Sequence, residues 1–379
     1  MLWNKKLRRN LNWYVPIATA LLIMIGLLAV ISAVEINKTG SPGIALVQKQ
    51  IISIVLGIIV VFMIQFFDYS VFEDFAEILY GLTISILSTI LIIGYTVSGG
   101  KRWINLGPFN FQPSEFSKIL MILVLAAVID RNKENLQYLT GFIKPFSYVL
   151  VPFVLILKQN DLGTSLVLLV IFIGMLFVGG ANTKFMAFIF GGGFASVVML
   201  IGSHFLFGTP LLFFKEYQLD RLLVFLNPGI DPNGIGYNLS QSKIAIGSGK
   251  FLGKGLFSGT QNQLRFLPEK HTDFIFSVIG EEFGYIGVIL IILLYAFLLW
   301  QIYNVALDAR DNYGRLVAVG VGTMFFFHII ENIGMTMGLM PITGLPLPFI
   351  SYGGSSMISS LAAIGLVINI NTRRKKIMF

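Results

Sequence analysis

The chain lacks cysteine altogether and contains few charged residues. Its 379 residues include no Cys, only 3 His, and 12% Asp, Glu, Lys and Arg. The absence of cysteine excludes disulfides, thiolate catalysis and Cys-bound zinc. A soluble domain carries about 25% charged residues, whereas 55% of this chain is hydrophobic. A chain of this composition needs lipid as its solvent, which excludes a set of soluble domains.

The net charge of +8 does not indicate a nucleic-acid partner, because the excess cations stand at the two ends of the chain. They flank the first and last apolar runs: Lys5, Lys6, Arg8, Arg9, Arg373, Arg374, Lys375 and Lys376. Clusters of this kind next to apolar runs are topology signals of membrane proteins.

Ten apolar runs approach the length of about 20 residues that a spanning helix needs. They cover residues 13–33, 45–65, 76–97, 115–130, 142–158, 163–179, 185–207, 274–300, 316–338 and 352–370. Only residues 158–161 separate the fifth run from the sixth, so one kinked or re-entrant segment is an alternative there. No Ala-x-Ala site follows the first run, so we expect no cleaved signal. The pattern predicts an all-α polytopic membrane protein, with residues 1–379 forming a single transmembrane domain.

The cations also predict the orientation of this domain. With both termini in the cytoplasm, the cytoplasmic segments hold fourteen Lys and Arg, and the short outer loops hold five. This bias favours cytoplasmic termini. The loop 66–75 does not fit this orientation, since it would be cytoplasmic but carries Asp68, Glu73 and Asp74 without a cation. Acidic residues count little in this rule, so we keep the orientation.

The segment 208–272 is too long for a simple connection between two helices. It contains seven cations and the turn sequences Asn227-Pro228-Gly229 and 231–234, and several glycines follow. On the predicted topology it is a large extracytoplasmic loop, and such a loop on a rigid bundle is a usual place for function. The segment 247–251 resembles a phosphate-binding loop but lacks the required spacing, so no nucleotide site is implied.

Charged residues inside or beside the spans are costly and therefore mark candidate functional sites. The first group surrounds the start of the fourth run, where Glu115 and Lys118 share one helix face because they are three residues apart. They are either a self-neutralising ion pair that fixes packing or the charged floor of an outer cavity. Arg102 and Trp103 precede them, and Trp103 is either an interface anchor or a surface for substrate. Pro113 suits a first helical turn, and Ser114 or an earlier residue suits its cap.

A second group meets the start of the eighth run, where Asp273 follows the long loop. A helix N-terminus favours its carboxylate, whereas partial burial raises its pKa. A carboxylate in that position could act as a general base, and a plain helix cap is the alternative. His271 beside it is interpreted as a hydrogen-bonding neighbour rather than a metal ligand.

Two further groups of residues have alternative interpretations. Asp161 could cap the sixth helix or help to bind a cation, and we favour the cap. The loop 342–356 is rich in Gly, Pro and Ser, whose small residues allow close backbone approach. His328 and Glu331 lie three apart in the ninth run and could pair inside the bundle or reach substrate.

Four ordered segments resemble the SEDS family (shape, elongation, division and sporulation) over the length of the chain. The segments are RWINLGPFNFQPSEFSK, QNDLGTS, FLPEKHTDFIFSVIGEEFG and GLMPITGLPLPFISYGGSS. The sequences 346–349 and 266–268 are more similar to the rod-shape branch of the family than to its division branch. The chain departs from the family pattern at Asn160, Asn238 and Lys250, none of which touches the first or second group.

The resemblance implies ten transmembrane helices and peptidoglycan glycosyltransferase activity on lipid II, a polyprenyl-linked sugar. It also implies a class B penicillin-binding protein as transpeptidase partner, within the elongation machinery of membrane proteins. The family's essential acidic residue falls on Asp273. Its other motif positions fall on Trp103, Gln112, Ser114, Glu115, Lys118, Arg221, Tyr237, Gln241 and Ser242.

A mechanism follows as a hypothesis. Asp273 takes the proton of the acceptor hydroxyl, which attacks the donor sugar from the face opposite its pyrophosphate. Arg102, Lys118, Arg221, Lys243 or a divalent cation supplies positive charge to the leaving group. No motif requires Mg²⁺ or Mn²⁺, although Asp273, Glu115 or Asp161 could hold one. A lipid II flippase and a non-catalytic scaffold for the transpeptidase are the alternatives.

Overall fold

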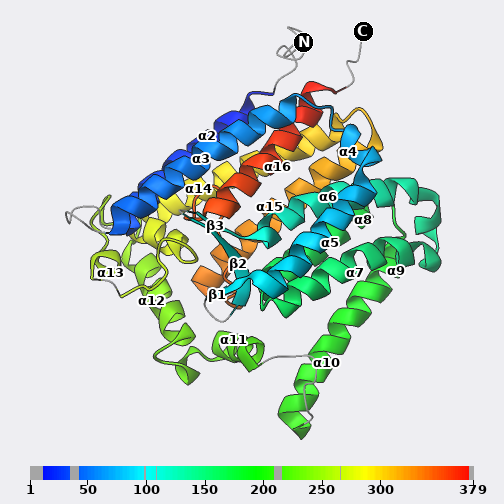
Figure 1. The fold of residues 1–379 in the computed structure, drawn as a ribbon. Helices are drawn as coiled ribbons and strands as arrows, with labels where there is room; N and C mark the ends of the chain where they lie inside the picture. The colour runs from blue at the N-terminus through cyan, green and yellow to red at the C-terminus, as the bar shows by residue number, and fades with distance from the viewer. Residues whose placement is uncertain are drawn as a thin grey trace.

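The computed structural model describes residues 12–34, 42–97, 100–107, 109–208, 216–264 and 266–374. Within these residues, each of the ten predicted runs forms a long helix (Figure 1). The helices are α2 (Tyr14–Ala33), α3 (Pro42–Gln65), α5 (Ala76–Ile93), α6 (Pro113–Arg131), α7 (Ile143–Lys158), α8 (Leu162–Val178), α10 (Gly192–Phe207), α14 (Ile275–Leu307), α15 (Asn312–Met337) and α16 (Gly354–Thr372). The prediction of an all-α polytopic membrane protein is therefore confirmed.

Among the described residues, eight helices are long and apolar enough to cross a membrane by themselves. Two of the ten fall short of that measure for different reasons. α8 is apolar but has only 17 residues, and α6 carries Glu115, Lys118 and Asp130. α7 and α10 reach the required length because helical turns before them extend the continuous segments to Leu139–Lys158 and Thr183–His204. The fifth and sixth runs are two separate helices, α7 and α8, so the alternative of one kinked segment is wrong.

Short elements connect the long helices. They are α4 (Val71–Asp74), η1 (Lys133–Gln137), η2 (Leu139–Phe142), α9 (Thr183–Met186), the π-helical turn η3 (Ala187–Gly191), α11 (Glu216–Leu226), η4 (Pro228–Ile230), α12 (Ile235–Ser248) and α13 (Thr260–Gln263). The sequence did not predict the small antiparallel sheet between α5 and α6, which consists of β1 (Tyr95–Val97), β2 (Gly100–Leu106) and β3 (Phe109–Phe111). This sheet carries Arg102 and Trp103 on β2.

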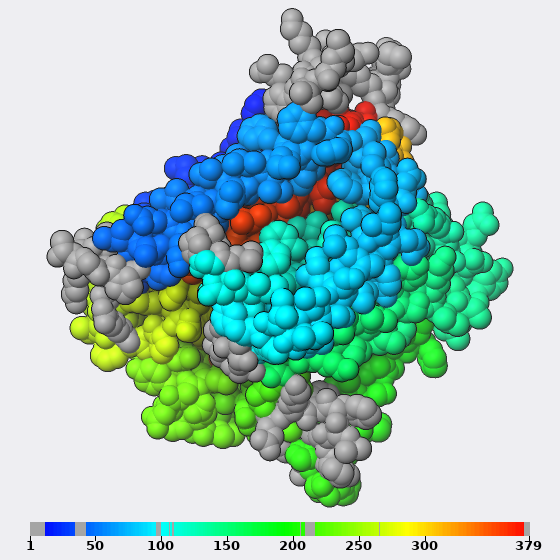
Figure 2. All heavy atoms as spheres, in the orientation of Figure 1, coloured from blue at the N-terminus to red at the C-terminus, as the bar shows by residue number. Residues whose placement is uncertain are grey.

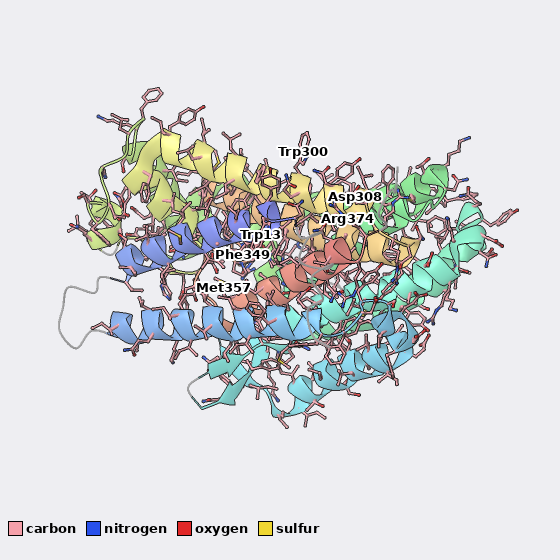
Figure 3. All side chains as sticks on the ribbon, turned by 90° about the horizontal axis from the view of Figure 1, so that it is seen from above. Trp13, Trp300, Asp308, Phe349, Met357 and Arg374 are labelled. Carbon is pink, nitrogen blue, oxygen red and sulfur yellow. The ribbon has the colours of Figure 1, made fainter. Side chains whose placement is uncertain are left out.

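The last helix, α16, lies near the middle of the bundle. It packs along α3, where a Cβ on Gly365 would lie 3.2 Å from Val61 Cα, so the glycine allows the two backbones to approach closely. In Figure 2, α16 shows only as a narrow strip beside α3. By contrast with the buried helix α16, the side chain of Trp300 on α14 is 66% exposed and projects from the bundle (Figure 3).

The described chain ends lie together at one end of the bundle, which we call the terminus end (Figure 1). There Asn12 Nδ2 donates to Gln301 Oε1 at 3.0 Å, and Arg374 bonds Asp308 at 2.9 Å. α6, α8, α14 and α16 all begin at the other end, which we call the cavity end. Seven cations used to predict topology lie outside the described residues: Lys5, Lys6, Arg8, Arg9, Lys38, Lys375 and Lys376.

The acidic loop 66–75 belongs to the terminus end, where cations from other segments contact it. Asp68 lies 3.6 Å from Arg310 and 3.4 Å from Arg373. The backbone carbonyl of Glu73 accepts a bond from Arg131 at 2.6 Å. The charge of Asp68 is therefore balanced by cations at the same end.

Candidate functional site

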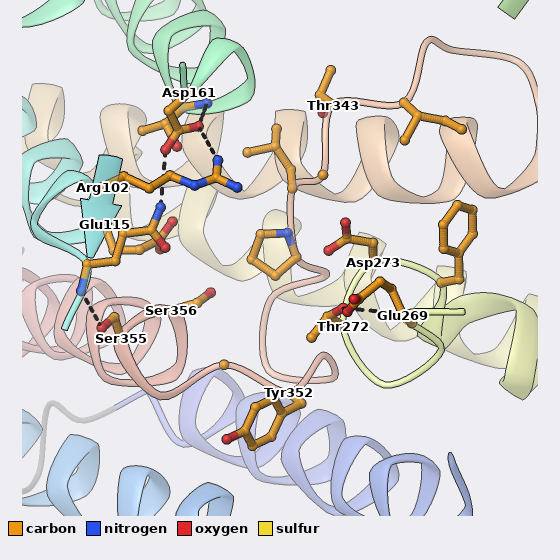
Figure 4. Close-up of a pocket in the computed structure, with 18 of the residues that line it drawn as sticks. Arg102, Glu115, Asp161, Glu269, Thr272, Asp273, Thr343, Tyr352, Ser355 and Ser356 are labelled. Carbon is orange, nitrogen blue, oxygen red and sulfur yellow. Dashed lines mark hydrogen bonds and ion pairs between the residues drawn. The ribbon is translucent and has the colours of Figure 1, made fainter. Parts of the chain in front are cut away.

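A polar cavity of about 390 Å³ opens at the cavity end (Figure 4). Segments far apart in the sequence line it, including β2, the first turn of α6, α11, the residues before α14 and the 342–349 loop. Its walls include Arg102, Trp103, Gln112, Glu115, Asp161, Arg221, Glu269, Thr272, Asp273, Thr343, Tyr352 and Ser355. The cavity therefore brings together members of all four groups that the sequence singled out.

The start of α6 forms a buried, charged wall. Pro113 occupies the first turn, as predicted, but the cap residue Gln112 makes no side-chain cap bond. Glu115 and Lys118 share a helix face, as predicted, and form an ion pair at 2.9 Å, with side chains only 4% and 2% exposed. Ser359 of α16 donates to the other Glu115 oxygen at 3.2 Å. Only Glu115 of the pair lines the cavity.

Asp161 caps α8, as we favoured, by accepting the backbone N–H of Thr164 at 3.2 Å. The same carboxylate accepts bonds from Gln112 Nε2 at 3.1 Å and Ser114 Oγ at 3.2 Å. Arg102 lies 3.7 Å from it. Asp161 therefore joins β2, α6 and α8, and the Ser114 hydroxyl serves this junction instead of capping α6.

Asp273 faces this junction across the cavity (Figure 4). It stands two residues before α14, whose cap residue is Phe274 and makes no side-chain cap bond. The alternative of a plain helix cap is therefore wrong. Burial, followed by the charge of Glu269, raises the pKa of Asp273 from 3.8 to about 6, while Arg102 and Arg221 act in the opposite direction.

Arg221 of α11 is the second cation at the cavity. Its NH1 donates to the backbone carbonyl of Thr343 at 2.9 Å, and its guanidinium lies 5.7 Å from the centre of the Tyr217 ring. Burial lowers the pKa of this guanidinium. On β2, Trp103 Nε1 and Arg102 Nε are buried without a hydrogen-bond partner among the described residues. Arg102 and Arg221 thus bring two guanidinium groups to the cavity wall.

Other predicted site residues lie away from the cavity. Lys118 is held inside by Glu115 and by His328 Nε2 at 3.1 Å. Lys243 packs against Gly338, where an added Cβ would meet its side chain at 2.2 Å. Three family positions on α12 also do not line the cavity: Tyr237, Gln241 and Ser242.

The suggested pairing of His328 with Glu331 is wrong. His328 contacts Lys118 and the Pro346 carbonyl, and Glu331 accepts a hydrogen bond from the Thr343 hydroxyl. The sequence also missed Asn332, which bonds the backbone of Asp273. The available signal was a polar stripe at 328, 331 and 332, which are spaced to share one helix face.

The three carboxylates considered for a divalent cation do not form a metal site. Asp161 and Glu115 are engaged by the partners described above, and Asp273 lies across the cavity from Asp161. Among the described residues, no three His, Asp or Glu side chains come together as ligands. We therefore derive no step through a metal.

Fold and site together define a polytopic membrane protein with a charged cavity at one end of its helical bundle. Residues 12–376 match the family of cell cycle proteins FtsW, RodA and SpoVE. The chain therefore belongs to this family, the SEDS family.

Named relatives span almost the whole chain. The probable peptidoglycan glycosyltransferase FtsW of Trichlorobacter lovleyi is 39% identical over 91% of this chain and 88% of its own. The peptidoglycan glycosyltransferase MrdB of Escherichia coli K12 is 36% identical over 94% of both chains. A solved chain from a peptidoglycan synthase complex, described for its coordination of polymerization and crosslinking, is 30% identical. It matches with a TM-score of 0.79 over 96% of this chain and 98% of its own.

Proposed function

We propose that this protein polymerises lipid II into glycan strands on the outer face of the bacterial cytoplasmic membrane. The two relatives with names are described as a probable peptidoglycan glycosyltransferase and a peptidoglycan glycosyltransferase. One observation carries the proposal to this chain. Asp273, whose pKa is raised to about 6, lies in a cavity with two arginine side chains.

Asp273 acts as the general base of this reaction. The acceptor 4-hydroxyl attacks the anomeric carbon of the donor from the face opposite the pyrophosphate, by analogy with inverting glycosidases. Asp273 removes the hydroxyl proton as the new bond forms. A base with a pKa near the working pH combines a large deprotonated fraction with sufficient basicity.

Arg102 and Arg221 stabilise the leaving pyrophosphate. Preorganised positive charge is most effective where negative charge develops in a site of low dielectric. Of the four cations considered from the sequence, these two line the cavity. Lys118 is committed to Glu115, and Lys243 packs on Gly338. Trp103 and Gln112 contact the sugars, and apolar grooves between the helices hold the polyprenyl tails.

The termini face the cytoplasm, so the cavity opens to the outside. Residues 1–379 form one transmembrane domain, and residues 208–272 form its large extracytoplasmic loop. The positive bias of the terminus end supports this orientation. It brings the cavity to the surface on which glycan strands assemble.

The protein acts in cell elongation and rod shape, as its segments 266–268 and 346–349 favour. It works with a class B penicillin-binding protein, which crosslinks the strands, and with other membrane proteins of the elongation machinery. The solved relative described for polymerization and crosslinking supports a transpeptidase partner.

The test is lipid II polymerisation by purified wild-type and Asp273→Ala protein, each bound to its transpeptidase partner. We expect glycan from the wild type only, with both proteins folded. Equal product from both would remove Asp273 as the base. Absence of product from both would favour a flippase, for which the buried Lys118 and Glu331 argue, or a scaffold. Transport of labelled lipid II into the opposite leaflet of vesicles would identify the flippase.

A further inference from the structure

One face of α15 carries three polar side chains that are almost fully buried. His328, Glu331 and Asn332 are spaced i, i+3 and i+4, so they project from the same side of the helix. They are 4%, 1% and 0% exposed. Buried polar groups in a membrane bundle are costly unless they are hydrogen-bonded, so their partners show what the stripe does.

All three side chains contact the 342–349 loop. His328 Nδ1 lies 3.3 Å from the Pro346 carbonyl. Glu331 accepts the hydroxyl of Thr343. Asn332 Nδ2 donates to the Leu345 carbonyl at 2.8 Å. The stripe therefore fixes the loop along its cavity-lining residues 343–346.

Asn332 also bonds the backbone of Asp273. Its second amide hydrogen bonds the backbone carbonyl of Asp273 at 3.0 Å. Both partners are carbonyl oxygens, which only accept, so the amide nitrogen must face them. Its Oδ1 is buried with no partner among the described residues. A single buried amide thus links Asp273 to the 342–349 loop.

The link matters because the loop lies close to the Asp273 carboxylate. Gly344 has φ of +78°, and a Cβ built there would lie 3.2 Å from Asp273 Oδ2. The next residue back, Thr343, holds Arg221 through its carbonyl. A shift of this loop would therefore change both the space beside the carboxylate and the position of a cation.

We propose that Asn332 is a positioning residue, which holds Asp273 in register with the 342–349 loop through its two carbonyl bonds. It does not touch the reacting atoms. The inference rests on the proposed function for its kinetic consequence, although the link itself is a property of the fold. Displacement of a catalytic group by about 1 Å can cost about 100-fold in rate.

The chain offers a matched control at the terminus end. Asn369 of α16 is also 0% exposed, and its Nδ2 donates to two carbonyls, those of Ile64 at 2.6 Å and Phe67 at 2.9 Å. It performs the same kind of link far from the cavity. Asn332→Leu and Asn369→Leu each remove an amide that bonds two carbonyls. Asn369 Oδ1 also accepts a bond from Arg373 at 2.7 Å, so Asn369→Leu removes at least as many hydrogen bonds as Asn332→Leu.

The experiment measures kcat and KM for lipid II, the melting temperature, and hydrogen exchange of residues 342–349 in both variants bound to the transpeptidase partner. Asn332→Leu is expected to lower kcat about 100-fold, with KM nearly unchanged and faster exchange in the loop. Asn369→Leu is expected to lower the melting temperature while kcat and loop exchange stay unchanged. Wild-type kcat in Asn332→Leu, or equal losses of kcat in both variants, would overturn the proposal.

A second variant covers the case in which Asn332→Leu does not fold. Thr343→Val removes the hydroxyl that Glu331 holds, at the edge of the cavity, and Thr343→Ser restores it. A fall in kcat that serine rescues supports positioning through the loop, and wild-type kcat in Thr343→Val contradicts it. If the wild type makes no glycan, the proposed function fails, and loop exchange alone decides whether Asn332 fixes the loop.

Discussion

The carboxylates of Asp68 at the terminus end and Asp273 at the cavity end differ in how their charges are paired. At the terminus end, Asp68 is shared by Arg310 and Arg373, and Asp311 accepts bonds from Tyr69 at 2.8 Å and Arg310 at 3.2 Å. At the cavity end, Asp273 makes no ion pair with a described residue, and its pKa is raised to about 6. A carboxylate whose charge is paired with nearby cations has a structural role. A buried carboxylate with a raised pKa and no ion pair instead indicates a ligand-binding or catalytic role.

The strongest test of this difference exchanges one carboxylate at each end. Asp273→Asn keeps the shape of the side chain but cannot accept a proton, so the polymerisation rate should fall by about 10²–10⁴-fold. Asp68→Asn should leave the rate unchanged. The measurement is glycan formed from labelled lipid II. Normal synthesis by Asp273→Asn would contradict its role as the base.

Breaking a buried ion pair should destabilise the protein more than breaking an exposed one. Glu115→Gln leaves Lys118 buried and unpaired, which should cost about 3–5 kcal/mol of unfolding free energy. The Asp308–Arg374 pair at the terminus end has side chains 54% and 36% exposed, so Asp308→Asn should cost about 0–1 kcal/mol. Unfolding in detergent measures both. Adding Lys118→Met to Glu115→Gln should restore stability, and a failure to do so would argue against an unpaired charge as the cause.

Cations at the two ends should also differ in their effect on rate. Arg221→Gln removes a guanidinium from the cavity and should lower kcat about 100-fold, because the leaving pyrophosphate loses a preorganised charge. Arg310→Gln breaks contacts to Asp68 and Asp311 and should leave kcat unchanged. Steady-state kinetics with lipid II distinguish the two. Equal effects would mean that Arg221 supports the fold rather than the reaction.

The pH dependence should be smaller and should have opposite signs for activity and stability. Because the base must be deprotonated, kcat should fall about tenfold for each pH unit below about 6. The folded state binds the Asp273 proton more tightly than the unfolded state, whose pKa is near 3.8. Stability should therefore decrease as the pH rises from about 4 to 6. Asp273→Asn should remove this contribution to stability, and an unchanged slope would assign it to another group.

Local features of this protein were readable from the sequence. Run length predicted ten helices, and turn chemistry predicted Pro113 in the first turn of α6 and Asp161 as a cap. The spacing of Glu115 and Lys118 predicted that they share one helix face, and their ion pair was one of the two alternatives that it left open. Each of these depends on residues within a few positions of one another, where helix geometry alone fixes which side chains meet.

The composition of the cavity depended on tertiary structure. The sequence could not show that Asp161 would meet Gln112 and Arg102, or that Lys243 would pack on Gly338 away from the site. Nor could it distinguish Asn332, which joins Asp273 to a loop, from other buried amides. Helix periodicity sets the face on which a side chain lies. The packing of segments that are distant in the sequence decides what that face meets, as in the contacts of Asp161 with Gln112 and of Asn332 with Asp273.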